Sequence, residues 1–110
     1  MEFQTESIGD DVAVIRGEGR LNMVSGPTLR EAAKRAIDGG RPRLVLDLAP
    51  IPFMDSSGLG AIISCLKSAR EAGGDLRIVS PSSQVAMVLK LSNVDKILPA
   101  YDSAEAAYRD

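Results

Sequence analysis

The chain of 110 residues has no histidine, no tryptophan and a single cysteine, Cys65. Without histidine, the Ser-His-Asp and Cys-His mechanisms of nucleophilic catalysis are excluded. Zinc and most transition-metal sites lose their commonest ligand, which one cysteine cannot replace. One cysteine also cannot form a disulfide within the chain. We therefore expect no metal, no cofactor and no catalytic triad.

Positive charge is scattered along the chain and does not exceed the negative charge. Lysine and arginine total 13 against 15 acidic residues, the net charge is −2, and no basic run occurs. Nucleic-acid binding needs a basic surface, and four aromatic side chains offer no base-stacking platform. No apolar run approaches the ~20 residues of a membrane span, and the acidic, polar segment 1–10 lacks the plan of a signal peptide. These features predict a cytoplasmic protein that contacts neither nucleic acid nor membrane directly.

Apolar spacing along the chain predicts strands that alternate with helices in a single domain, residues 1–110. The expected elements are strands at 3–8 and 12–16 joined by a hairpin, a helix from Ser25 or Gly26 to Gly39, a buried strand at 44–48, a helix from about Gly58 to Gly73, a strand at 76–79, a helix from 81–83, an extended piece at 97–98 and a last helix capped by Asp102. The strand-helix-strand unit within 44–79 requires two parallel strands. The predicted fold class is α/β, with a small mixed β-sheet of four to five strands packed by about four helices.

The turn Asp55-Ser56-Ser57-Gly58 lies between a buried strand and a helix. Sites in open α/β sheets gather there, because a helix N-terminus offers unpaired N–H groups and a partial positive charge. Capping that helix requires one polar residue, and this turn supplies three. A hydroxyl in this position can act as a nucleophile, bind an anion or accept a phosphoryl group.

The catalytic alternatives for this serine turn have little support in the sequence. A nucleophilic serine would lack a histidine base, and the flanking residues do not form a G-x-S-x-G elbow. The stretch 64–67 matches S-x-x-K, but the companion S-D-N and K-T-G motifs are absent. The segment 58–60 is not a P-loop, because no G-K-[ST] follows. The phosphate acceptor is favoured, and two alternatives stay open: an enzyme that uses Ser56 with Asp55 or Lys67, and small-ligand binding at the helix N-terminus.

Residues 45–70, centred on Phe53-Met54-Asp55-Ser56-Ser57-Gly58-Leu59-Gly60, resemble the signature of bacterial anti-sigma-factor antagonists, in the STAS-domain family. The resemblance extends to segments 19–22, 73–74 and 91–96. It implies partner switching: the unphosphorylated antagonist binds an anti-sigma factor, which is also a serine kinase, and thereby frees a sigma factor. Phosphorylation ends the binding, and a PP2C-type phosphatase reverses it. The resemblance also implies a monomer when the domain is free.

The same resemblance assigns the phosphorylated residue to Ser56. The residues that it implies for partner binding are Asn22, Met54, Asp55, Ser57, Gly58, Leu59 and Gly60. A phosphoryl group on Ser56 would add about −1.5 to −2 charges beside Asp55, and no arginine lies within ten residues of it in the sequence. We expect such a charge to disrupt an interface by repulsion and desolvation.

Asn22 departs from the family pattern, because relatives usually carry an acidic residue in this corner. Asparagine keeps an acceptor and gains donors but loses the charge. Either phosphoryl transfer or the choice of partner is altered, or Asn22 is a turn residue in a left-handed conformation. A different alternative for the whole chain is a STAS module that serves for docking in a sensory or lipid-transport complex and is not phosphorylated.

Overall fold

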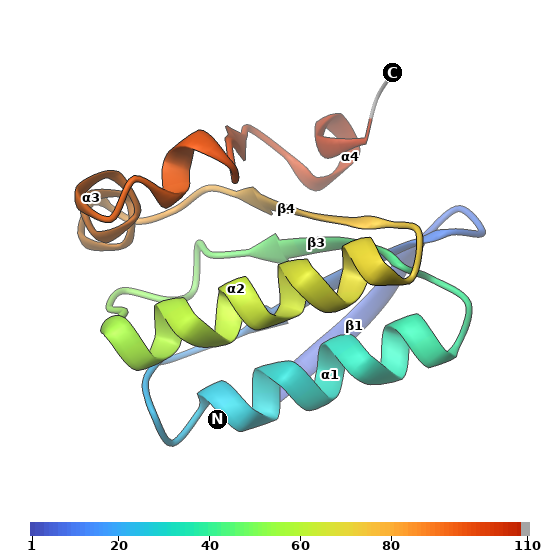
Figure 1. Cartoon of the computed structure of the whole chain (residues 1–110), viewed down its shortest axis with the longest axis horizontal. Coiled ribbons are helices and arrows are strands. Elements are labelled where there is room, and N and C mark those ends of the chain that lie inside the picture. The colour runs from blue at the N-terminus through green and yellow to red at the C-terminus, as the bar shows by residue number, and fades with distance from the viewer. Residues whose placement is uncertain (109–110) are drawn as a thin grey trace.

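Five strands form one sheet in the order β1-β2-β3-β4-β5 (Figure 1). The computed structural model describes residues 1–108. Its elements are β1 (Phe3–Ile8), β2 (Val12–Gly17), α1 (Gly26–Asp38), β3 (Arg43–Asp47), α2 (Ser56–Glu71), β4 (Asp75–Val79), α3 (Ser83–Leu91), the 3₁₀-helix η1 (Val94–Lys96), β5 (Ala100–Tyr101) and α4 (Ala104–Ala107). β1 is antiparallel to β2, and all other pairs are parallel. The predicted α/β class, the mixed sheet and the hairpin are confirmed.

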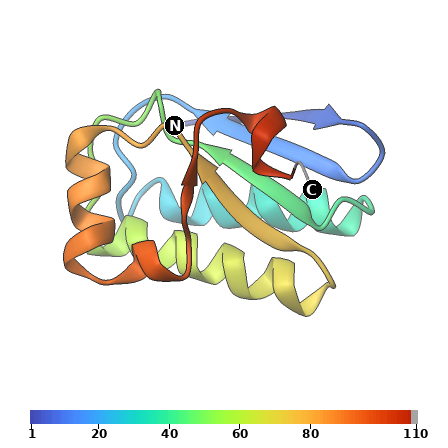
Figure 2. The same cartoon turned by 90° about the horizontal axis from the view of Figure 1, so that it is seen from above.

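Helices cover both faces of the sheet. α1 and α2 lie side by side on one face, and α4 lies on the other (Figures 1 and 2). Strand residues that face α1 and α2 are Ala13, Ile15, Leu44, Leu46, Leu76 and Ile78. Those that pack with α4 are Val12, Val14, Val45 and Val79. The central strands are apolar on both faces because both faces are covered, as the run at 44–48 predicted.

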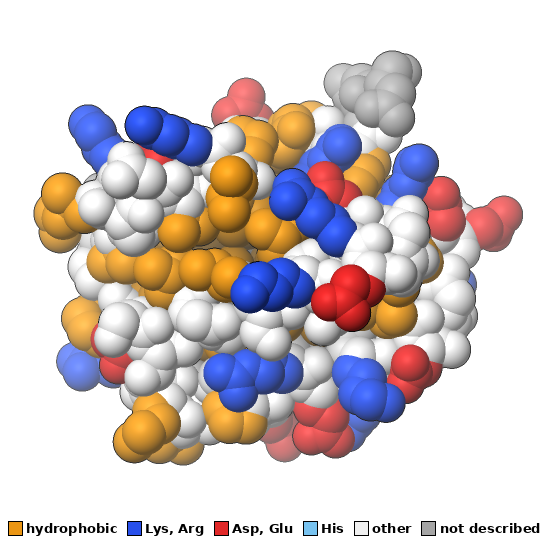
Figure 3. Space-filling view, in the orientation of Figure 1, with side chains coloured by type: hydrophobic (Ala, Val, Ile, Leu, Met, Phe, Trp, Pro, Cys, Tyr) orange, Lys and Arg blue, Asp and Glu red, His pale blue; other side chains and the backbone are white. Residues whose placement is uncertain are grey.

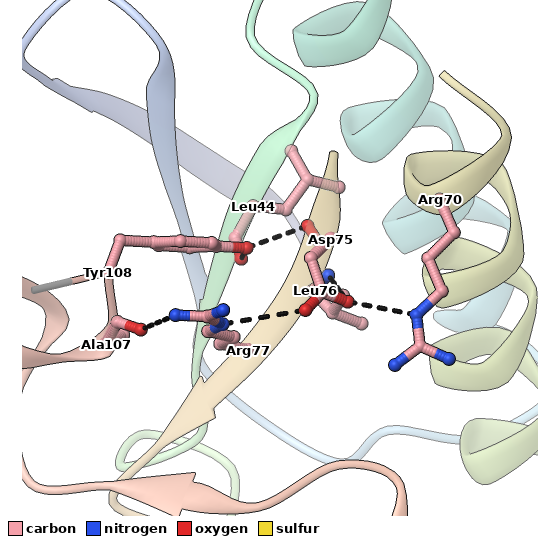
Figure 4. Close-up of polar contacts among 7 residues, drawn as sticks. All are labelled: Leu44, Arg70, Asp75, Leu76, Arg77, Ala107 and Tyr108. Carbon is pink, nitrogen blue, oxygen red and sulfur yellow. Dashed lines mark hydrogen bonds and ion pairs between the residues drawn. The ribbon is translucent and has the colours of Figure 1, made fainter. Parts of the chain in front are cut away.

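Tyr108, directly after α4, contacts the backbone of β3 and β4 and so holds α4 against the sheet (Figure 4). Its hydroxyl lies 2.8 Å from the backbone carbonyl oxygens of both Leu44 and Asp75, which share its single proton. The guanidinium of Arg77 lies 4.3 Å from the centre of the Tyr108 ring. Burial, with the nearby carboxylate of Asp75, raises the pKa of this phenol well above its usual value. The hydroxyl therefore stays protonated and remains a donor at neutral pH.

Two predictions for the last third of the chain were wrong. Residues 97–98 are not extended, because Asn93 takes a left-handed conformation and starts η1. The backbone N–H groups of Ile97 and Leu98 then both donate to the carbonyl of Val94, at 3.0 Å. The cap of α4 is Ser103 rather than Asp102: the Ser103 hydroxyl accepts from the N–H of Ala106 at 3.2 Å.

Candidate functional site

The serine turn, residues 55–58, is held against the corner at residues 19–22. The N–H of Leu21 donates to the carbonyl of Phe53 at 2.9 Å, and the N–H of Asp55 donates to the carbonyl of Leu21 at 3.2 Å. Leu21 and Met54 also pair as an isolated parallel bridge. Leu21 has no exposed surface, so these bonds form in a dry environment. The corner and the turn therefore form one rigid unit.

Asp55 is the cap of α2, which begins at Ser56. Its carboxylate accepts from the N–H of Gly58 at 2.9 Å. The side chains of Ser56 and Ser57 are exposed, and neither hydroxyl makes a hydrogen bond to another residue within 1–108. Asp55 alone caps α2, as the sequence indicated that one polar residue would. The hydroxyls of Ser56 and Ser57 therefore remain free to interact with other molecules.

Gly58 and Gly60 have opposite surroundings. A Cβ atom on Gly58 would lie 2.2 Å from the carbonyl oxygen of Leu21, whereas a Cβ on Gly60 would have nothing within 4 Å. Gly58 is buried and Met54 is 1% exposed, so neither offers much surface in the free domain, and their contact with a partner stays a prediction. They hold the turn from beneath. Leu59 and Asp55 are half-buried and Gly60 is exposed, beside the two serines.

Asn22 organises the turn that leads into α1. Its side-chain oxygen accepts from the N–H groups of Val24 and Ser25, at 3.0 and 3.2 Å. The hydroxyl of Ser25 does not cap α1; it donates to the carbonyl of Arg20 at 2.8 Å. Asn22 is therefore a turn residue, although not in the left-handed conformation: the only non-glycine residues in 1–108 with positive φ are Ser80 and Asn93. A carboxylate oxygen would accept the same two bonds.

Gln84 is a supporting residue that the sequence did not reveal. Its side chain accepts from the N–H of Met54 at 2.9 Å and donates to the carbonyl of Met54 at 3.0 Å. It reaches the turn from the first turn of α3, 30 positions along the chain. A glutamine in a short helix carries no motif, so only the fold could reveal this contact.

We predict that Gln84→Ala lowers the free energy of unfolding by about 2 kcal/mol, because both backbone groups of Met54 lose their partner. Urea unfolding measures the loss, and hydrogen exchange should show faster exchange at the Met54 amide. Gln4→Ala, on an exposed position of β1, is the matched control and should change stability by less than about 0.5 kcal/mol. Equal effects of the two substitutions would contradict the supporting role.

A hollow of about 300 Å³ opens beside Ser57, between the first turns of α1 and α2. It is lined by Asn22, Met23, Gly26, Pro27, Arg30, Ser57 and Gly60. α1 thus brings Arg30 close to Ser57, although 27 positions separate them in the sequence. The guanidinium of Arg20, in the corner at residues 19–22, lies 5.3 Å from the centre of the Phe53 ring. No arginine lies within ten residues of Ser56 in the sequence, but distance along the chain does not reveal that the fold places Arg30 in the same hollow as Ser57.

Hydrophobic side chains gather at this end of the molecule. Figure 3 shows them mainly on the left, where α2 begins and α3 lies, whereas charged side chains dominate the right. Met23 and Val24, which follow Asn22, are 74% and 78% exposed, and Phe53 is 36% exposed. Large exposed apolar side chains that cluster on a surface mark a binding face. Here they flank the serine turn.

The family model for the STAS domain matches residues 3–107. The chain belongs to the STAS-domain family. An anti-sigma F factor antagonist of Paenibacillus polymyxa is 32% identical over 93 residues, which are 84% of this chain and 80% of that protein. The crystal structure of a Thermotoga maritima protein covers 97% of this chain and 95% of its own, with TM-score 0.86 and 29% identity. The anti-sigma factor antagonist SpoIIAA in its unphosphorylated form gives TM-score 0.80 at 25% identity, over 94% of this chain and 91% of its own.

Other chemistry in this STAS domain has little geometric support. Lys67 lies eleven residues beyond Ser56 in the same helix, about 16 Å along its axis, and is too distant to act as its base. Burial raises the pKa of the Cys65 thiol to about 11, so it is not a nucleophile at neutral pH. Within 1–108, no three acidic or cysteine side chains form a group that could hold a metal ion. In the same range, no helix is both long and apolar enough to cross a membrane.

Proposed function

We propose that this STAS domain is an anti-sigma-factor antagonist of the bacterial cytoplasm that acts by binding, without catalysis, and is switched off by phosphorylation at Ser56. One observation carries the proposal: Ser56 is the exposed first residue of α2, and its hydroxyl takes no part in the cap. A kinase can reach this hydroxyl without unfolding any part of the domain. The partners would be an anti-sigma factor with serine-kinase activity and a PP2C-type phosphatase.

The surroundings of Ser56 support a mechanism by which one phosphoryl group would separate the domain from its partner. Before modification, Ser56 itself is uncharged and the surface around it is partly apolar, with Met23, Val24 and Phe53 exposed. A phosphoryl group adds about −1.5 to −2 charges at its centre. The N-terminal dipole of α2 tolerates that charge in the free domain. A partner packed over it would have to desolvate it, which costs binding energy.

The test is phosphorylation with ATP and an anti-sigma-factor kinase from the same genome, followed by mass spectrometry. We expect one phosphoryl group, located on Ser56. Ser57→Ala should still be modified, and Ser56→Ala should not. If the kinase binds the domain but neither serine is modified, the domain is a docking module and the proposed switch is wrong.

A further inference from the structure

The hollow beside Ser57 has a positively charged wall and no negative charge of its own. Arg30 is exposed, and the other six lining residues are uncharged. The arginines at 16, 35, 43, 70 and 77 all form ion pairs with carboxylates, but Arg30 has no carboxylate partner among residues 1–108. Arg20 and Arg41 also have no carboxylate partner in this range, so Arg30 is distinguished by its position in the wall of the hollow.

Two glycines shape the hollow. Gly26 lets α1 approach α2: a Cβ on it would lie 3.3 Å from the Cβ of Ala61 and 3.8 Å from the carbonyl oxygen of Ser57. Gly60 leaves the floor bare, since nothing lies within 4 Å of where its Cβ would stand. Met23, 74% exposed, adds an apolar edge. The result is a small socket whose one charge is that of Arg30.

We propose that this socket binds an aspartate or glutamate side chain of the anti-sigma factor; the inference rests on the proposed function. Arg30 offers paired N–H donors that match a carboxylate, a bond stronger than one between neutral groups. An arginine anchor among apolar residues is a common hot spot of protein interfaces. The socket adjoins the serine turn, so a phosphoryl group there would repel the same carboxylate. Phosphorylation would then weaken one particular contact, the ion pair between Arg30 and the carboxylate of the partner.

The first test compares two arginines of α1. Arg30→Gln should weaken binding of the anti-sigma factor at least tenfold, and Arg30→Glu at least a hundredfold. Arg35→Gln is the matched control, because Arg35 lies outside the socket and pairs with Glu31. It should change the affinity less than about threefold. Raising salt from about 0.05 to about 0.5 M should weaken wild-type binding more than binding of Arg30→Gln.

The second test fills the socket from within. Gly60→Glu places a carboxylate in the hollow that Arg30 lines, where the open space accepts it without moving the core. It should weaken binding at least tenfold, whereas Ser68→Glu, which adds the same charge on the exposed face of α2 outside the socket, should bind as the wild type does. Circular dichroism of each variant confirms that it is folded.

The outcomes separate the socket from the function. If the anti-sigma factor binds the wild type, Arg30→Glu and Gly60→Glu equally, the socket does not bind the partner's carboxylate, and the proposed function stands. If no anti-sigma factor of the source genome binds the wild-type domain, both are overturned. If only the Arg30 variants and Gly60→Glu lose binding of the anti-sigma factor, the result supports both the socket and the proposed function.

Discussion

Gly58→Ala is expected to lower the free energy of unfolding by about 3 kcal/mol or more, the largest loss for any single methyl group added to this turn. The new Cβ would lie 2.2 Å from the carbonyl oxygen of Leu21 and 2.8 Å from its carbonyl carbon. Backbone atoms cannot rotate away as a side chain can. The corner at residues 19–22 would have to move, which would strain the hydrogen bond from the Asp55 N–H to the same carbonyl oxygen of Leu21.

Gly60→Ala is the control for that prediction. It lies two residues further along α2, in open space, and gains the same helix propensity. We expect it to raise stability by about 0.5–1 kcal/mol. Urea unfolding measures the difference in stability between the two variants. The gain in helix propensity is the same in both and therefore cancels from this difference. If the two variants have equal stability, the close approach of Leu21 to Gly58 is not a constraint on the fold.

Local patterns were enough to predict most of the fold. The apolar run at 44–48, the polar turn at 9–11 and the glycine pairs that end the first two helices set strands and helices in their observed order. Capping chemistry also predicted that one polar residue of the serine turn would be used, and Asp55 is that residue. The prediction of an extended piece at 97–98 was wrong because the left-handed residue Asn93 redirects the chain, and apolar spacing does not record such a turn.

The site depends on contacts that no local pattern contains. Gln84 binds the backbone of Met54 from another helix, and Arg30 shares a hollow with Ser57 because α1 packs beside α2. The different surroundings of Gly58 and Gly60 follow from where Leu21 lies, not from the sequence around them. The sequence predicted a functional role for the turn; the fold determines which residues support it and which remain exposed.

Ser56→Asp should weaken binding of the anti-sigma factor at least a hundredfold, about 2.8 kcal/mol, without loss of stability. The two effects separate because Ser56 is the first residue of α2. A carboxylate there interacts favourably with the helix dipole, by about 0.3–1 kcal/mol, so the free domain should be as stable as before or slightly more so. The same charge becomes costly only when a partner covers it. Calorimetric titration and thermal unfolding measure the two quantities.

Two variants complete the experiment. Ser56→Ala should bind like the wild type and resist inactivation by the kinase and ATP. Ser68→Asp adds the same charge twelve residues further along α2, about 18 Å away along the axis, and should bind normally. If Ser56→Asp and Ser56→Ala bind equally, negative charge at this position does not control the interface and the switch is wrong. If Ser56→Asp and Ser68→Asp weaken binding equally, the effect comes from net charge, and the position of Ser56 has no special role.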